Sequence, residues 1–95
     1  MAEKKFILVV YDISNDRRRT KLHDLLLDYG TPVQYSVFEC EINDTRLIRL
    51  QRDLMQVIDA EEDNVRFYPL NEADIKKIIT QGRATLDRIQ KHYVV

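Results

Sequence analysis

Runs of apolar residues along the chain predict alternating strands and helices. Residues Lys5–Asp12 form a short run that is apolar at nearly every position and rich in strand formers. Because a run of this kind does not alternate with polar residues, we expect both faces of this strand to be covered. The same reasoning predicts another strand at Asn64–Leu70.

Two segments carry apolar side chains at helical spacing. The first begins at the potential N-cap residues 14–16 and is expected to end at Gly30, which Pro32 follows. Its apolar stripe consists of Leu22, Leu25, Leu26 and Tyr29. Asn43 or Asp44 is expected to cap the second helix. Its stripe consists of Leu47, Leu50, Leu54, Val57 and Ile58.

The remaining segments are less regular. Residues 33–42 have strand character, but their apolar phase shifts near Ser36, which indicates a bulge or a break in the strand. Residues 75–80 fit either a short strand or a helical stretch, and residues 84–91 have weak helical character. We expect the apolar end, residues 93–95, to be an edge strand that pairs with its own sheet or with a partner's.

The alternation of strands and helices predicts a single domain over residues 1–95, built as a sandwich of a sheet and helices with right-handed crossovers. Crossover handedness places both helices on one face of the sheet. The other face then lacks cover from this chain. A second copy packed on that face would give a twofold dimer.

The positions of the charged residues along the chain indicate which partners the protein can bind. The 95 residues include 15 Lys plus Arg and 16 Asp plus Glu, so the formal net charge is −1. A neutral total argues against nucleic-acid binding, but the charges are segregated. Acidic residues concentrate at 59–63, and basic residues at 17–21 and 76–91. Nucleic acid therefore remains a candidate partner.

Cysteine content and the N-terminal pattern bear on the cellular compartment. Cys40 is the only cysteine, so the chain has no internal disulfide, and we expect it to be a small buried hydrophobic residue. Only six apolar residues, 6–11, follow the N-terminal lysines, which is too few for a signal peptide or a membrane span. We therefore expect a reduced, cytoplasmic protein with no membrane partner.

Asp12 is the main candidate for chemistry, because it ends the first strand. In sheets covered by helices, ligands bind where strands end, and a carboxylate there can hold a hard divalent cation. One carboxylate is a poor metal site, but a twofold axis near this strand would bring together Asp12 from both chains. The alternative is that Asp12 only accepts backbone hydrogen bonds in a tight turn.

The residues around Asp12 allow similar pairs of interpretations. Arg17, Arg18 and Arg19 span most of a helical turn and oppose the helix dipole. They fit either phosphate contacts or a solvated face with Asp16 as a partner. The aromatic side chains of Tyr11 and Phe38 fit either base stacking or the core. For His23 and His92 we expect surface or interface positions.

Four segments together resemble a known family. They are residues 10–19 (VYDISNDRRR), 26–30 (LLDYG), 33–39 (VQYSVFE) and 65–69 (VRFYP). Nearly the whole chain is similar, in order, to the small core CRISPR adaptation protein, the nuclease-like partner of the spacer integrase. This resemblance implies an α+β, ferredoxin-like βαββαβ sandwich with an additional C-terminal edge strand, which forms a homodimer through its sheet faces. It also implies that the strand at 33–42 divides at Ser36, and that residues 75–95 can pair with the partner subunit.

The resemblance assigns roles to individual residues. The family's metal-binding aspartate falls on Asp12, which would hold Mg²⁺ or another divalent cation such as Mn²⁺. Tyr11, Arg19 and Phe38 match positions associated with activity, and we expect Arg19 to stabilise charge on the reacting phosphate. The expected nucleic-acid contacts are Arg17, Arg18, Arg19 and Lys21. An arginine that some members carry before the Gln-x-Ser motif is absent here, where residues 31–33 are Thr, Pro and Val.

The implied function is a metal-dependent endonuclease that hydrolyses phosphodiester bonds of RNA, double-stranded DNA or both. It would act with the spacer integrase in spacer acquisition. Two alternatives remain open at this stage. One is a noncatalytic DNA-binding scaffold of the integrase complex, and the other is a toxin-type endoribonuclease, which shares the fold and the aspartate at the strand end.

Overall fold

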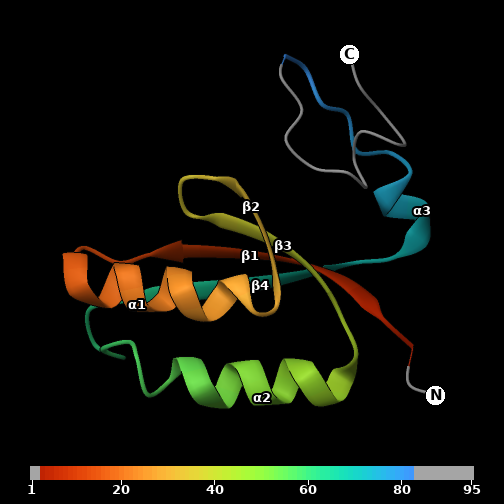
Figure 1. Ribbon diagram of the computed structural model, residues 1–95. Coiled ribbons are helices and arrows are strands. Elements are labelled where there is room, and N and C mark those ends of the chain that lie inside the picture. The colour runs from red at the N-terminus through yellow and green to blue at the C-terminus, as the bar shows by residue number, and fades with distance from the viewer. Residues whose placement is uncertain (1–2, 83–95) are drawn as a thin grey trace.

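The computed structural model describes residues 3–82, so the segments expected at 84–91 and 93–95 lie outside the described residues. Strands and helices alternate as the sequence predicts (Figure 1). In chain order they are β1 (Lys5–Asp12), α1 (Asp16–Leu27), β2 (Gly30–Gln34), β3 (Val37–Ile42), α2 (Asp44–Leu54), β4 (Asn64–Leu70) and α3 (Glu72–Ile75).

The strands form one sheet in the order β2-β3-β1-β4, and every neighbouring pair is antiparallel. The helix α1 connects β1 to β2 across β3, and α2 connects β3 to β4 across β1. This split βαβ arrangement is the ferredoxin-like layout of an α+β domain. Both long helices lie against the same face of the sheet, as crossover handedness predicts (Figure 1).

The hydrophobic core lies between this face and the two long helices. From the sheet it takes alternate residues, because successive strand side chains point to opposite faces. The buried cluster consists of Ile7, Val9, Tyr11, Ile13, Leu22, Leu26, Phe38, Cys40, Ile42, Leu50 and Leu54. Burial raises the pKa of the Cys40 thiol to about 11, so this side chain is an inert hydrophobic residue, as expected.

The intervening residues of the strands form a second surface, which we call the outer face. It is the face of the sheet opposite α1 and α2. Its members on the paired strands include Leu8, Val10, Asp12, Val37, Glu39, Asn64, Arg66 and Tyr68. Leu8, Val10 and Val37 are partly buried, whereas Asp12 and the three β4 residues are exposed.

Helix starts follow the predicted caps, but the end of α1 does not follow the prediction. The Asn15 and Asn43 side chains accept hydrogen bonds at 2.9 Å from the amides of Arg18 and Arg46. The prediction that Gly30 ends the first helix is wrong, because Gly30 begins β2. A Cβ at Gly30 would lie 2.4 Å from the Glu39 carbonyl oxygen, so close strand packing requires the glycine.

The segment at 33–42 divides where its apolar phase shifts. Residues 35–36 form a turn between β2 and β3, so the resemblance was right to divide the strand at Ser36. Pro32 lies in β2 at the edge of the sheet, where a missing amide hydrogen is tolerated. The second helix ends at Leu54, before the last two residues of its predicted stripe.

Past β4, residues 75–80 do not form a strand, and Ile75 closes the short helix α3. Among residues 3–82, no helix combines the length and the apolar character needed to cross a membrane.

Candidate active site

The Asp12 carboxylate is exposed at the end of β1, on the outer face of the sheet. Tyr11 precedes it and points into the core on the opposite face, where it lies close to Phe38. One strand therefore presents its two predicted functional residues to different sides of the sheet. The structure does not bring Asp12 together with Tyr11, Arg19 and Phe38, although it places the latter three near one another.

Arg66 is the basic residue that shares a face with Asp12. In the β1–β4 register, Asn64 is opposite Asp12 and Arg66 is opposite Val10. The Arg66 Nε donates to Asn64 Oδ1 at 3.1 Å, and its Nη1 donates to the Tyr68 hydroxyl at 3.3 Å. The hydrogen bond to Tyr68 raises the pKa of Arg66. These contacts hold a permanent positive charge beside the strand end that carries Asp12.

Neither Asn64 nor Arg66 is among the functional residues that the sequence predicts. The signal that could have found them is the spacing of two within β4, because residues 64, 66 and 68 must share one face of the sheet. The pairing of β4 with β1 was also needed, since it determines that this face is the one that carries Asp12.

Arg19 anchors the loop that follows Asp12. Its Nη1 donates to the Ile13 carbonyl oxygen at 2.8 Å, and Nη2 forms an ion pair with the Asp16 carboxylate. A weaker contact at 3.4 Å reaches the Ser14 carbonyl oxygen. This side chain therefore fixes the backbone between β1 and α1, from the helix side of the sheet.

Arg18 is committed to the acidic segment before β4. Its Nε donates to Asp63 Oδ2 at 2.7 Å, and its Nη2 donates to Asp63 Oδ1 at 3.2 Å and to Glu62 Oε2 at 3.1 Å. The Asp63 side chain has no exposed surface and also accepts from the Asp59 amide at 2.8 Å. The hydrogen bond from Arg18 holds the pKa of Asp63 below its usual range. These contacts join α1 to the segment between α2 and β4.

The Arg17 and Lys21 side chains are exposed, and neither makes a hydrogen bond or an ion pair with another residue in the described part of the chain. Arg18 and Arg19, in contrast, have carboxylate partners. The contacts to nucleic acid expected from all four residues stay predictions. Arg17 and Lys21 are the two whose charges remain available to a phosphate.

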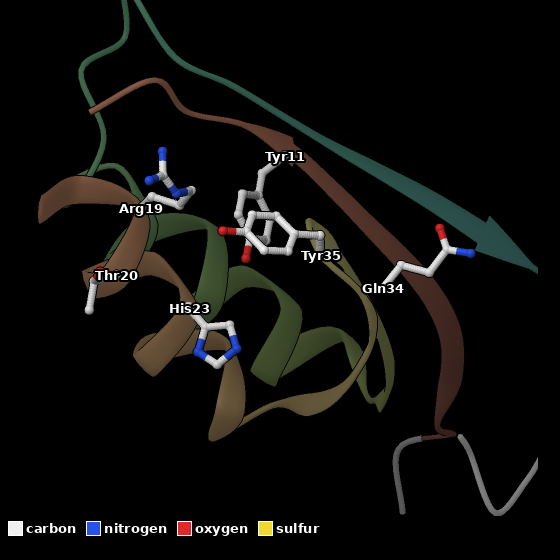
Figure 2. A pocket seen from close by; sticks show the side chains of 6 residues that line it. All are labelled: Tyr11, Arg19, Thr20, His23, Gln34 and Tyr35. Carbon is white, nitrogen blue, oxygen red and sulfur yellow. The ribbon is translucent and has the colours of Figure 1, made fainter. Parts of the chain in front are cut away.

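A pocket of about 310 Å³ lies on the helix side of β1. It is lined by Tyr11, Arg19, Thr20, His23, Gln34 and Tyr35. In Figure 2, the Tyr11 and Tyr35 rings lie close together with Arg19 beside them, whereas His23 lies farther along α1 and Gln34 points away. Burial raises the pKa of the Tyr11 hydroxyl, an effect that the positive charge of Arg19 opposes.

The residues around Asp12 fit a cation that keeps much of its water. Mg²⁺ needs only one or two protein carboxylates when waters and substrate phosphates complete its shell. Asp12 supplies one exposed carboxylate. Between residues 3 and 82 there is no group of three or more His, Cys, Asp or Glu side chains that would hold a metal ion. The donor set of one chain therefore suits Mg²⁺ or Mn²⁺ only with water, phosphate or a second chain.

Comparison with known proteins agrees with this architecture. The family model of the CRISPR associated protein Cas2 matches residues 5–78. A CRISPR-associated endoribonuclease Cas2 from Synechocystis is 42% identical over 81 residues, which cover 85% of this chain and 88% of the relative.

Two solved structures have a similar fold. Streptococcus pyogenes Cas2 matches with a TM-score of 0.73 and 33% identity, over 81% of this chain and 99% of that chain. A chain of a partial Cas6-RT-Cas1–Cas2 complex matches with a TM-score of 0.69 and 41% identity, over 76% of this chain and 84% of its own. The strands, the helices and the sequence motifs are thus shared, and the chain belongs to the CRISPR-associated Cas2 family.

Proposed function

We propose that this chain is a Mg²⁺-dependent endonuclease that hydrolyses phosphodiester bonds of RNA, double-stranded DNA or both, and that acts with a spacer integrase in CRISPR adaptation. The observation that carries the proposal is the exposed Asp12 carboxylate, which lies on the same face as Arg66. The Synechocystis relative is named an endoribonuclease, and one structural neighbour belongs to a complex with Cas1, which supports both parts of the proposal.

Within this proposal, Asp12 and Arg66 have complementary roles. Asp12 would hold the cation, Mg²⁺ or Mn²⁺ in its place, through its carboxylate. When bound, the cation supplies charge neutralisation at the phosphate and lowers the pKa of a water molecule. Arg66 contacts a phosphate oxygen and stabilises its growing negative charge. This role was expected of Arg19, but Arg19 lies on the helix side of the sheet. Arg19 acts instead as a positioning residue for the loop after Asp12.

A homodimer through the outer faces would complete the site. Each chain contributes one carboxylate, and a twofold axis near the end of β1 would bring two Asp12 side chains together. Without a cation, two adjacent carboxylates would repel one another. The two Asp12 carboxylates would hold a divalent cation between them, and its positive charge would offset this repulsion.

The proposal is tested by Asp12→Asn, assayed for cleavage of defined RNA and duplex DNA substrates with Mg²⁺. We expect the variant to lose cleavage while keeping its circular dichroism spectrum and its Tm, because Asp12 is exposed. Asp24→Asn is the matched control, since Asp24 is an exposed carboxylate on α1. Cleavage by Asp12→Asn at the rate of the parent would contradict the role of Asp12.

A second candidate function is a noncatalytic scaffold that holds DNA for the integrase. Two observations favour this function. The exposed side chains of Arg17 and Lys21 on α1 are free to contact phosphates, and one similar solved structure comes from a Cas1–Cas2 complex. The two functions separate when spacer acquisition and cleavage are measured side by side in Asp12→Asn. A scaffold keeps acquisition in this variant, whereas an endonuclease whose cleavage is required loses it.

A further inference from the structure

The pocket beside Tyr11 is separate from the chemistry proposed at Asp12. Tyr11 points to the helix side of the sheet and Asp12 to the outer face. The volume of about 310 Å³ lies at the lower end of the range for small-ligand sites. Its lining combines aromatic rings, which can stack on a base, with an arginine, which can pair with a phosphate.

We propose that this pocket binds one unpaired nucleotide, with its base against the Tyr35 ring and its phosphate near Arg19. The inference rests on the proposed function in that the ligand is taken to be part of a nucleic acid. It goes beyond that function because it gives the protein a second contact, on the other side of β1, that selects nucleotides outside a duplex.

Tyr35 provides the surface for stacking. It lies in the turn between β2 and β3, and 88% of its surface is exposed. A ring so exposed gains little from packing within the chain, but it offers a π-face to a base. Figure 2 places this ring beside Tyr11, and both side chains line the pocket. A base there would cover an aromatic surface that is otherwise in water.

The inner wall of the pocket is held in place by the core. The His23 ring meets Phe38 edge-on, with 5.2 Å between ring centroids and 69° between ring planes. The Tyr11 ring lies 6.4 Å from the same Phe38, which is fully buried. Phe38 therefore fixes the orientation of both pocket side chains, so binding needs little rearrangement of this wall.

Two polar groups give the pocket its chemical preference. The Tyr11 hydroxyl is protonated near neutral pH, as tyrosine ordinarily is, and burial raises its pKa further, so that it can donate a hydrogen bond. Arg19 uses some of its five N–H donors for Ile13, Ser14 and Asp16, and the others remain for an anion. Because Asp16 offsets the charge of Arg19, we expect base stacking to supply most of the affinity.

The size of the pocket restricts the ligand to an unpaired nucleotide. A paired base inside a duplex is stacked on both faces and has its Watson–Crick edge covered, so it cannot enter a pocket of this size. A nucleotide at a frayed end, in an overhang or in a loop has a free face for Tyr35.

The test measures binding without a divalent cation, by NMR titration of the protein with a nucleoside 5′-monophosphate, ribose 5-phosphate and inorganic phosphate. We expect the nucleotide to bind at least about tenfold more tightly than either phosphate compound, and Tyr35→Ala to remove about tenfold of this affinity. Tyr35→Phe keeps the ring and should bind like the parent. Met55→Ala is the control, because it removes a large exposed side chain that lies outside the pocket.

A second arm compares a blunt duplex with the same duplex carrying a one-nucleotide overhang. We expect the parent to prefer the overhang and Tyr35→Ala to lose this preference. Equal affinity of nucleotide and inorganic phosphate, or equal effects of Tyr35→Ala and Met55→Ala, would overturn the inference. Asp12→Asn should still bind the nucleotide in the pocket. Cleavage by Asp12→Asn at the rate of the parent would contradict only the proposed function. Failure of the parent to bind the nucleotide would contradict only this inference.

Discussion

At the scale of single residues, the three consecutive arginines of α1 differ in the contacts that their side chains make. Arg18 is paired with Asp63 and Glu62, and Arg19 is tied to the loop and to Asp16. Only Arg17 is exposed and lacks a partner in the described part of the chain. The cost of placing basic residues in the first turn of α1 is therefore offset by specific acidic partners.

The ion pair between Arg18 and Asp63 predicts a dependence of stability on pH. The pKa of Asp63 is lowered in the folded state, so its contribution is complete above the unfolded value of about 4 and is lost as pH falls through the lower folded value. We expect Asp63→Asn to lower the Tm by several degrees at pH 7.

The check is a set of thermal melts of the parent and Asp63→Asn between neutral and strongly acidic pH. The difference in Tm should shrink as the pH falls below about 4, because protonation removes the charge in the parent as well. A control variant, Glu61→Gln, changes an exposed acidic residue of the same segment. A difference in Tm that stays constant with pH would count against the ion pair.

At the scale of elements, α1 and β1 divide the functional surface between two sides of the sheet. The helix carries the available charges of Arg17 and Lys21 and one wall of the pocket, whereas β1 presents Asp12 on the outer face. Both elements meet at the loop that Arg19 anchors. Under the proposed function, we therefore expect different substitutions to change nucleic-acid binding and hydrolysis separately.

We predict that replacing Arg17 and Lys21 together by Ala weakens duplex binding and makes its salt dependence shallower. The slope of log affinity against log salt should fall by about one for each phosphate that the variant no longer neutralises. The measurement is a binding isotherm at several salt concentrations. Arg49→Ala together with Arg52→Ala on α2 is a control of equal charge, and it should leave the slope less changed. If both double variants changed the slope equally, the loss of net charge would explain the result, and specific contacts from α1 would not be needed.

The elements themselves were largely predictable, because their signals are local. Asn15 and Asn43 cap the helices as expected, and the strand ranges Lys5–Asp12 and Asn64–Leu70 agree with the structure. The role of Gly30 was not predictable, because it depends on the position of Glu39 across the hairpin. A glycine after a helical stripe looks like a helix end until its strand partner is known.

The candidate site was predictable only in part, because its groups come together through pairing across the sheet. Asp12 is marked by its place at a strand end, and Tyr11 and Arg19 follow from the resemblance. Arg66 joins the Asp12 face only through the register between β1 and β4. Asp63 is 45 positions from Arg18, and no local pattern links the two.

At the scale of the whole molecule, the sheet has one face in the core and one face with partly exposed apolar residues. Leu8, Val10 and Val37 lie together on the outer face, next to Asp12. A short domain of this size gains much from burying such a surface against a second copy. The proposed homodimer would therefore serve both stability and the assembly of the site.

We predict that Val10→Glu shifts the protein toward a monomer and lowers cleavage, because a buried carboxylate at the proposed dimer interface is unfavourable. Light scattering at several protein concentrations measures the mass. Ile48→Glu is the matched control, since Ile48 is 66% exposed on α2. An unchanged mass for Val10→Glu would exclude the outer face as the interface, and a monomer that cleaves like the parent would show that the second Asp12 is not needed.

The most direct test of the central claim is a titration of cleavage with Mg²⁺, made with defined RNA and duplex DNA substrates for the parent and Asp12→Asn. We predict that the parent's rate rises to saturation with the cation, that chelation abolishes it, and that Mn²⁺ restores it. Asp12→Asn should show no cation-dependent cleavage at any concentration. Cleavage by the parent that is independent of the cation, or an identical titration curve for Asp12→Asn, would contradict the account.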